Sequence, residues 1–191
     1  MEVKLGLGKA TGMFYHAAAG TSLPTSLSTS LPAAWTEIGD VSEAGITLTM
    51  NKSVTNLRNW ANVIKRVIMT EHSETIQSPI MDTTSESLKA VVGSSNVTVS
   101  GNDVTVKLSD GELPPEEAFL WLMKDGNDLM AIGCSYGQVS AVDNVTFAPN
   151  AAINWTPTIT AMGDDGFKLI VETSGSTGGT GTTGATGTSG N

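Results

Sequence analysis

Apolar and polar residues alternate most regularly between Ala33 and Gly93, and this stretch organises our interpretation of the chain. From Ile46 to Met50 every second residue is apolar, and the residues between them are threonines. A period of two places the apolar side chains on one face of an extended strand and the polar ones on the other. The pattern therefore predicts a half-buried strand over Gly45 to Met50.

Two further apolar segments, Val63 to Thr70 and His72 to Met81, are rich in β-branched residues. Such residues favour strands over helices, so we predict two strands here. Pro79 cannot donate a hydrogen bond to a neighbouring strand, which places it at a sheet edge or a strand end. The polar segment Asn51 to Asn62 has no alternation, and we predict that it is a loop.

One helix is predicted over Asp82 to Gly93. Asp82 or Thr83 can cap its first turn, and Glu86 stands three residues after Thr83, as in a capping box. Leucine and valine recur on one side of the segment, and Gly93 can end the helix.

The remaining chain also has the pattern of strands and turns. We predict strands over Gly12 to Ala18 and Trp35 to Val41, joined by an extended surface connection, Ala19 to Ala34. Valines alternate on both sides of Gly101-Asn102-Asp103, which predicts a hairpin there. A last hairpin is predicted from Ala152 to Thr173, with its turn at Gly163 to Gly166.

The segment Glu112 to Lys124 fits two structures. Its prolines could begin a helix, or it could form the first arm of a hairpin that turns at Asp125 to Asp128. We favour the hairpin because the second arm, Leu129 to Cys134, is short, apolar and bounded by turn residues.

The composition supports a mainly β protein. Hydrophobic residues make up 39% of the 191 residues and charged residues only 15%, below the roughly 25% of typical soluble domains, and Gly, Ser and Thr are abundant. This length suits one domain, which we place at residues 1–173. Residues 174–191 are almost all Gly, Ser, Thr and Ala, so we predict a flexible tail.

The chain is acidic, with a formal net charge of -9. From Asn96 onward there are eleven acidic and three basic residues. An acidic surface repels phosphate, which argues against a nucleic-acid reader that uses basic contacts. It is compatible with a protein that faces DNA without holding it.

No catalytic, cofactor or metal site emerges from the motifs. Gly133-Cys134-Ser135-Tyr136-Gly137 matches G-x-S-x-G, but no helical pattern follows it, and both histidines, His16 and His72, precede the serine instead of following it. The single cysteine excludes an intrachain disulfide. The N-terminal segment lacks the apolar core of a signal peptide, and no apolar run reaches membrane-span length, so we expect a soluble cytoplasmic product with no membrane partner.

The order of these elements resembles that of the tail tube (major tail protein) family of long-tailed, siphovirus-like bacteriophages. The resembling features begin with the strand Trp35 to Gly39 and the alternating strand entered at Gly45. A loop that ends at Trp60, a strand pair through Met81 and a short helix, Ser85 to Val92, complete the pattern.

The resemblance implies a β-sandwich or barrel with one short flanking helix and no enzymatic activity. Copies would form hexameric rings that stack into the tail tube of the virion, assembled in the host cytoplasm. Their joined inner sheets would surround a channel through which DNA and the tape-measure protein pass without specific binding.

The resemblance also assigns candidate residues. The segment from Asn51 to Asn62 matches the family's inter-ring loop, and Glu71 or Glu74 would face the channel. The residues expected to contact the adjacent ring are Asn51, Lys52, Asn56, Leu57, Arg58 and Trp60.

Two other functions remain open from the residues alone. A monomeric extracellular β-sandwich that acts as a binding module would have the same frequent hairpins. A hydrolase that uses Ser135 is the more distant alternative.

Overall fold

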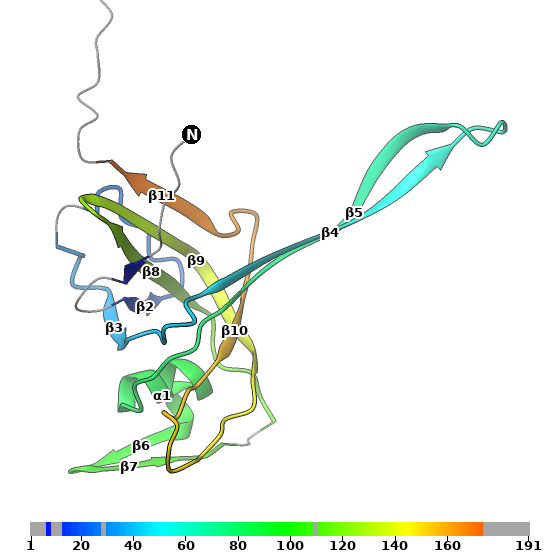
Figure 1. Ribbon diagram of the computed structural model, residues 1–191. Helices are drawn as coiled ribbons and strands as arrows, with labels where there is room; N and C mark the ends of the chain where they lie inside the picture. Colours follow the sequence, from blue (N-terminus) through cyan, green and yellow to red (C-terminus); the bar gives the residue numbers. More distant parts are fainter. Residues whose placement is uncertain (1–6, 9–12, 28–29, 109–110, 174–191) are drawn as a thin grey trace, which may run out of the picture.

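The computed structural model describes residues 7–8, 13–27, 30–108 and 111–173. The protein is mainly β, as predicted, with a compact body from which one long hairpin projects (Figure 1). The predicted tail, residues 174–191, lies outside the described residues. The strands are β1 (Leu7–Gly8), β2 (Phe14–Ala18), β3 (Thr36–Gly39), β4 (Thr47–Arg58), β5 (Ile64–Gln77), β6 (Val97–Ser100), β7 (Asp103–Val106), β8 (Glu117–Asp125), β9 (Asp128–Val142), β10 (Pro157–Ala161) and β11 (Lys168–Glu172).

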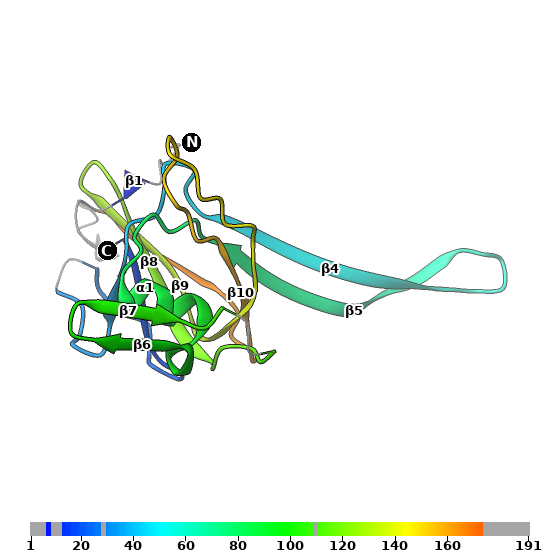
Figure 2. The same cartoon turned by 90° about the horizontal axis from the view of Figure 1, so that it is seen from below.

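Nine of the described strands form one antiparallel sheet. Its main path runs β3-β2-β8-β9-β10-β5-β4, with β1 paired to β8 and β11 paired to β9. Strands β6 and β7 form a separate hairpin, as the valine pattern predicted. The helix α1 (Ser85–Val92) and a short 3-10 turn, η1 (Ser94–Asn96), lie beside it. Seen from below, α1, β6 and β7 cover one side of the sheet (Figure 2).

The core has two layers because the middle of the sheet is buried on both faces. On one face, Phe14 stacks on Trp121 with ring centroids 4.6 Å apart, and Val91 of α1 packs in the same cluster. On the other face, Leu120 packs with Leu27 and Trp35 from the connection that precedes β3. A strand buried on both faces has no polar side, which explains why the sequence of β8 was compatible with either a helix or a strand. The hairpin prediction for this segment is confirmed.

The predicted loop Asn51 to Asn62 is wrong over most of its length. Strand β4 continues to Arg58 and pairs with β5 residue by residue. Its sequence lacks alternation because both faces of the ribbon are exposed in the single chain, so no buried face selects apolar positions. The turn itself comprises Asn59 to Val63.

The two strands predicted over Val63 to Met81 are one strand, β5. Ser53 pairs with Glu71 and Val54 with Met69, so Thr70 is an extra residue at a β-bulge and not a break between strands. The strand ends at Gln77, and Pro79 lies just beyond it, as its missing N–H requires.

The helix forms where predicted, but its cap differs. Thr84 is the N-cap and Ser87 completes the capping box, instead of Thr83 with Glu86. Asp82 is occupied elsewhere, because its carboxylate accepts a hydrogen bond from the Asp40 N–H at 2.7 Å. The Thr83 hydroxyl accepts one from the Trp155 indole at 3.2 Å. The two predicted caps therefore connect the helix to neighbouring segments.

The predicted final hairpin is also wrong. Strands β10 and β11 do not pair with each other but lie one after the other along the same long strand, β9. The turn residues between them form an outward loop, after which the chain continues in the same direction. Phe167 at the end of this loop packs against Trp121, with ring centroids 6.2 Å apart, and this contact holds the loop to the core where strand pairing is interrupted.

Candidate functional site

Strands β4 and β5 and the turn between them form a two-stranded arm, residues 47–77, whose far end extends away from the body (Figures 1 and 2). We call the part as far as the pair Ser53–Glu71 the inner arm and the part beyond it the outer arm. Every residue of β4 is exposed, as is β5 from Ile64 to Ser73. An isolated two-stranded hairpin is at best marginally stable in water, so a ribbon of this length calls for a partner.

Apolar side chains on the arm are exposed in numbers that a single soluble chain rarely tolerates. Val54 is 56% exposed, Val67 57% and Met69 58%. The full set of exposed large apolar residues on the arm is Leu48, Met50, Val54, Leu57, Trp60, Val63, Ile64, Val67, Ile68 and Met69. Contiguous exposed apolar surface marks an interaction site.

Apolar groups occupy both faces of the outer arm. Val54 stands opposite Met69 and shares a face with it, because directly paired residues point to the same side of a sheet. Ile68, the neighbour of Met69, points to the other face and stands opposite Thr55. The outer arm can therefore be buried fully only if partners contact it from both sides.

The turn at the tip of the arm is held by its own hydrogen bonds. The Asn59 side-chain oxygen accepts from the Val63 N–H at 2.9 Å, and the Asn62 N–H donates to the Asn59 carbonyl at 2.9 Å. Asn62 has φ 60°, a left-handed conformation that asparagine tolerates better than most residues. Trp60 projects from this ordered turn with its side chain completely exposed, at 105%.

The six residues predicted to contact an adjacent ring all lie on the arm. Trp60 is in the turn, and the other five, Asn51, Lys52, Asn56, Leu57 and Arg58, are in strand β4. The Arg58 guanidinium donates to the Asn62 carbonyl at 2.9 Å, so one of its roles is to hold the tip. Their contact with another ring stays a prediction.

The inner part of the arm has one entirely polar face. We call this surface "the polar face". On the arm it consists of Thr47, Thr49, Asn51 and Ser53 of β4 with their partners Gln77, Thr75, Ser73 and Glu71 of β5. On the opposite face, Ile76 is completely buried in the core of the body. The β5 side of this opposite face therefore joins the core, but Leu48 is 39% exposed and Met50 62%, so the predicted burial of the apolar face of Gly45 to Met50 is wrong in the single chain.

The polar face continues across β10 into β9. Thr158 pairs with Gln77 and Thr160 with Thr75, which places both threonines on the same side as the arm residues. The Gln77 amide donates to Thr158 Oγ1 at 3.4 Å, and the Thr160 hydroxyl donates to Ser140 Oγ at 2.9 Å. Four neighbouring strands thus present hydroxyl and amide groups on one surface.

The two candidate channel carboxylates are on opposite faces. Glu71 belongs to the polar face, where the Ser53 hydroxyl donates to it at 3.3 Å. Glu74 points the other way: it is 16% exposed, contacts His72 at 3.2 Å and accepts the Phe167 N–H at 2.8 Å. The geometry favours Glu71 as the channel candidate, and channel exposure itself stays a prediction.

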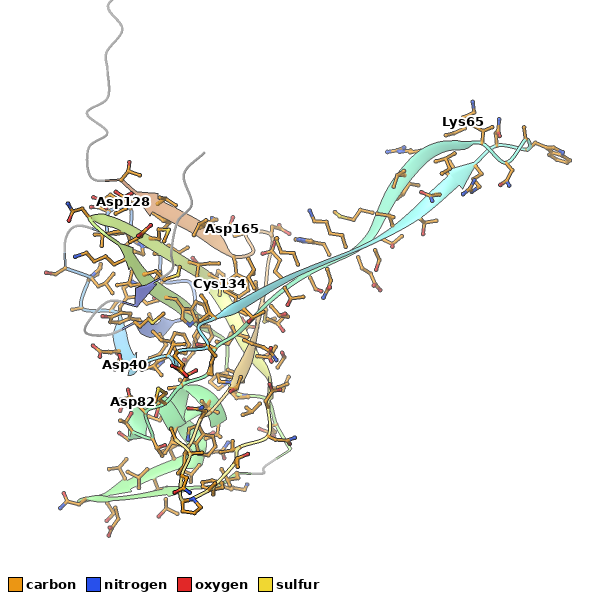
Figure 3. The ribbon with its side chains drawn as sticks, in the orientation of Figure 1. Asp40, Lys65, Asp82, Asp128, Cys134 and Asp165 are labelled. Carbon is orange, nitrogen blue, oxygen red and sulfur yellow. The ribbon has the colours of Figure 1, made fainter. Side chains whose placement is uncertain are left out.

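Charge is divided between the arm and the body. The arm carries four basic and two acidic residues, and the rest of the chain carries six basic and seventeen acidic residues. Figure 3 shows Lys65 near the far end of the arm, and Asp40, Asp82, Asp128 and Asp165 on the body. The arm of one copy is therefore electrostatically suited to the body of another.

The G-x-S-x-G string lies in the middle of strand β9. Ser135 is therefore not on a strand-to-helix turn, which is the geometry a hydrolase requires. Beside it Cys134 is buried, and burial raises the pKa of its thiol to about 12. His16 is paired with Glu117 at 2.8 Å.

The described residues contain no group of three or more His, Cys, Asp or Glu side chains placed to hold a metal. Within the same part of the chain, no helix has the length and apolar character needed to cross a membrane.

Sequence reasoning missed the extent of the polar face. Its signal was present in the alternating threonines of β4, but the matching residues of β5 and β10 become neighbours only through pairing. The register that aligns them depends on a bulge, which sequence periodicity does not reveal.

Comparisons with known proteins were made on the sequence and on the fold. A family model described as phage tail tube protein matches residues 7–173. A similar solved structure is described as the tail of an empty GTA particle computed with helical refinement and C6 symmetry. It shares 9% identity at a TM-score of 0.45, covering 84% of this chain and 95% of that one. No curated protein sequence matches the chain.

Proposed function

The chain belongs to the phage tail tube protein family, and we propose that its copies assemble into stacked hexameric rings around a channel. As a member of this family it is a structural subunit of the virion tail. The number six is the one that the sequence resemblance implies.

The observation that carries the proposal is the apolar arm. Its exposed residues, Val54, Val67 and Met69 among them, give a free subunit a surface that favours association. Apolar groups on both faces of the outer arm suit insertion between neighbouring copies. The sheet also has edge strands, β3 and β4 at the ends of its main path and β1 and β11 beside it, and ring closure would cover such edges.

We propose that the polar face lines the channel. The Ser53, Thr75 and Thr160 hydroxyls are neutral and well hydrated, so they would not hold phosphate as lysine or arginine does. Glu71 adds a negative charge that repels the DNA backbone. DNA and the tape-measure protein would therefore pass without specific binding, and assembly would take place in the host cytoplasm.

The inter-ring contact is assigned to the tip and the outer arm. Trp60 and Arg58 belong to the residue types that recur at binding hot spots. Leu57 adds exposed apolar surface beside them. Lys52 and Asn56 would contribute polar contacts at the rim, whereas Asn51, which the resemblance also assigned to this contact, lies on the polar face and would border the channel. No step of this function needs catalysis.

Electron microscopy of the purified protein tests the proposal. We expect rings and tubes with sixfold end views at high protein concentration. A variant in which residues 53–70 are replaced by a short turn is the matched control, and it should remain as dispersed particles. If the intact chain also remains dispersed at every concentration, the proposal is wrong and a monomeric binding module becomes the better interpretation.

A further inference from the structure

We propose that Trp60 of one copy docks into a partly apolar pocket on the body of a second copy, and that this contact joins successive rings. The inference rests on the proposed function, because it requires assembly. It adds the receiving surface, which neither the sequence nor the family match assigns.

The pocket lies where the end of α1 meets the segment after β7 and the last part of β9. Its volume is about 150 Å³. Leu108 is 66% exposed, Leu113 60% and Val142 40%, so the single chain leaves its rim open to water. The lining is mixed: its apolar residues are Val91, Val92, Leu108, Leu113, Pro114, Val139, Ala141 and Val142, and its polar or charged residues are Asn96, Lys107, Glu112 and Ser140. A hollow of this size can accept an aromatic ring, and the indole of tryptophan has both an apolar body and an N–H for a polar partner.

Trp60 is the matching ligand on the same chain. All four tryptophans lie in the described part of the chain, and Trp35, Trp121 and Trp155 are buried while Trp60 is completely exposed. The hydrogen bonds of the turn already order the backbone that carries the indole, so less conformational entropy is lost when it binds. A large aromatic group that enters a pocket is the usual form of an interface hot spot.

Charge complementarity favours a second copy as the partner. The tip region carries Lys52, Arg58, Lys65 and Arg66, with no acidic residue between positions 52 and 70. The pocket is lined by one residue of each sign, Glu112 and Lys107, so the attraction comes from the acidic body as a whole. A basic arm is drawn to that surface.

The positions of tip and pocket explain why the contact would build a tube. In Figure 1 the tip lies at the upper right, and α1 and β7, which border the pocket, lie at the bottom of the body. Tip and pocket are different surfaces, so a contact that the same two copies do not make in both directions is heterologous and can continue from copy to copy. Each copy offers a free tip and a free pocket, so the contact repeats in one direction.

A double-mutant cycle on the critical concentration for assembly tests the inference. Loss of a hot-spot contact raises a dissociation constant by more than about tenfold. We expect Trp60→Ala and Leu113→Asp each to raise the critical concentration by about that factor or more. Leu169→Asp is the control, because Leu169 is 63% exposed on β11 and lies outside the pocket.

The cycle separates a direct contact from independent effects. If Trp60 occupies the pocket, the double variant Trp60→Ala with Leu113→Asp should raise the critical concentration no more than the larger of the two single changes does. Trp60→Ala and Leu169→Asp should combine additively. Full additivity of Trp60→Ala with Leu113→Asp, or no effect of either, would overturn the inference while tubes of the unchanged protein still support the proposed function.

Fluorescence of the unchanged protein gives a second measurement. Trp60 is the exposed tryptophan, so acrylamide should quench a large part of the emission of free subunits and much less of that of tubes. Equal quenching in both states would overturn the docking of Trp60. If the unchanged protein forms no tubes, the proposed function and the inference fail together.

Discussion

Glu71 and Glu74 lie on opposite faces of strand β5, although only two residues separate them. Glu74 accepts the Phe167 N–H at 2.8 Å and so connects the arm to the loop between β10 and β11. Glu71 points to the polar face, where it accepts a hydrogen bond from the Ser53 hydroxyl of the neighbouring strand. One carboxylate therefore serves the fold of the single chain, and the other faces the surface proposed to line the channel.

Replacement of Glu74 should weaken the free subunit. Hydrogen bonds to charged groups contribute about 1.5–3 kcal/mol, so we expect Glu74→Ala to lower the free energy of unfolding by roughly that amount. Glu71→Ala is the control and should change it by less than about 0.5 kcal/mol. Urea unfolding of both variants measures the difference, and equal losses would contradict the assignment of the two faces.

Ser78 is expected to be important for the core. Its hydroxyl accepts the Trp121 indole N–H at 2.9 Å, and both side chains are completely buried. Ser78→Ala would leave that N–H without a partner, at a cost of about 1–3 kcal/mol. Denaturant unfolding followed by tryptophan emission measures the cost. Ser140→Ala, an exposed change, is the comparison, and a loss in Ser78→Ala no larger than in Ser140→Ala would argue against this contact.

The buried thiol of Cys134 should make stability fall at high pH. Burial raises its pKa from 9.0 to about 12 in the folded chain. Below pH 9 the thiol is neutral in both states and its contribution to stability is complete. Between pH 9 and 12 only the unfolded chain ionises freely, so that contribution is lost as the pH rises.

Unfolding measured across this pH range, with Cys134→Ala beside it, checks the prediction. The variant should lose less stability between pH 9 and 12 than the unchanged protein does. Thiol reagents should label the folded protein slowly. Parallel pH profiles, or rapid labelling of the folded chain, would contradict the burial of this group.

Polar replacement on the arm should affect assembly and leave folding unchanged. Val54→Ser with Met69→Ser removes two exposed, paired apolar groups, so the free energy of unfolding of the free subunit should change by less than about 0.5 kcal/mol per site. The critical concentration for tubes should rise by about tenfold or more. Val99→Ser, an equally exposed valine on β6, is the control, and a similar rise in that variant would show that the effect is not specific to the arm.

The extent to which the fold was predictable depends on which faces are buried. The valine pattern predicted the β6–β7 hairpin correctly, and the Gly93 stop and the spacing of Leu88 and Val91 located α1. The arm was predicted only in part, because Asn51 to Arg58 forms a strand whose apolar face has no partner within one chain. A rule based on burial cannot recognise a strand that has no buried face in the single chain.

The candidate surfaces follow the same logic. The resemblance assigned Trp60 to the inter-ring contact; the structure shows its side chain exposed at the tip of the arm, and the contact itself stays a prediction. The opposite orientation of Glu71 and Glu74 follows from strand alternation, but the sequence did not indicate which of them lies on the open polar face and which contacts Phe167. The pocket around Leu113 brings together three segments distant in the chain, so no local pattern could indicate it.

A cryo-electron microscopy map of the assembled protein tests the central claim most directly. The account predicts rings in which the arms of neighbouring copies pack side by side, with Thr49, Ser73 and Thr75 facing the channel and Trp60 against the next ring. A map in which the polar face lies on the outer surface of the tube, or in which the arms extend into solvent, would contradict it.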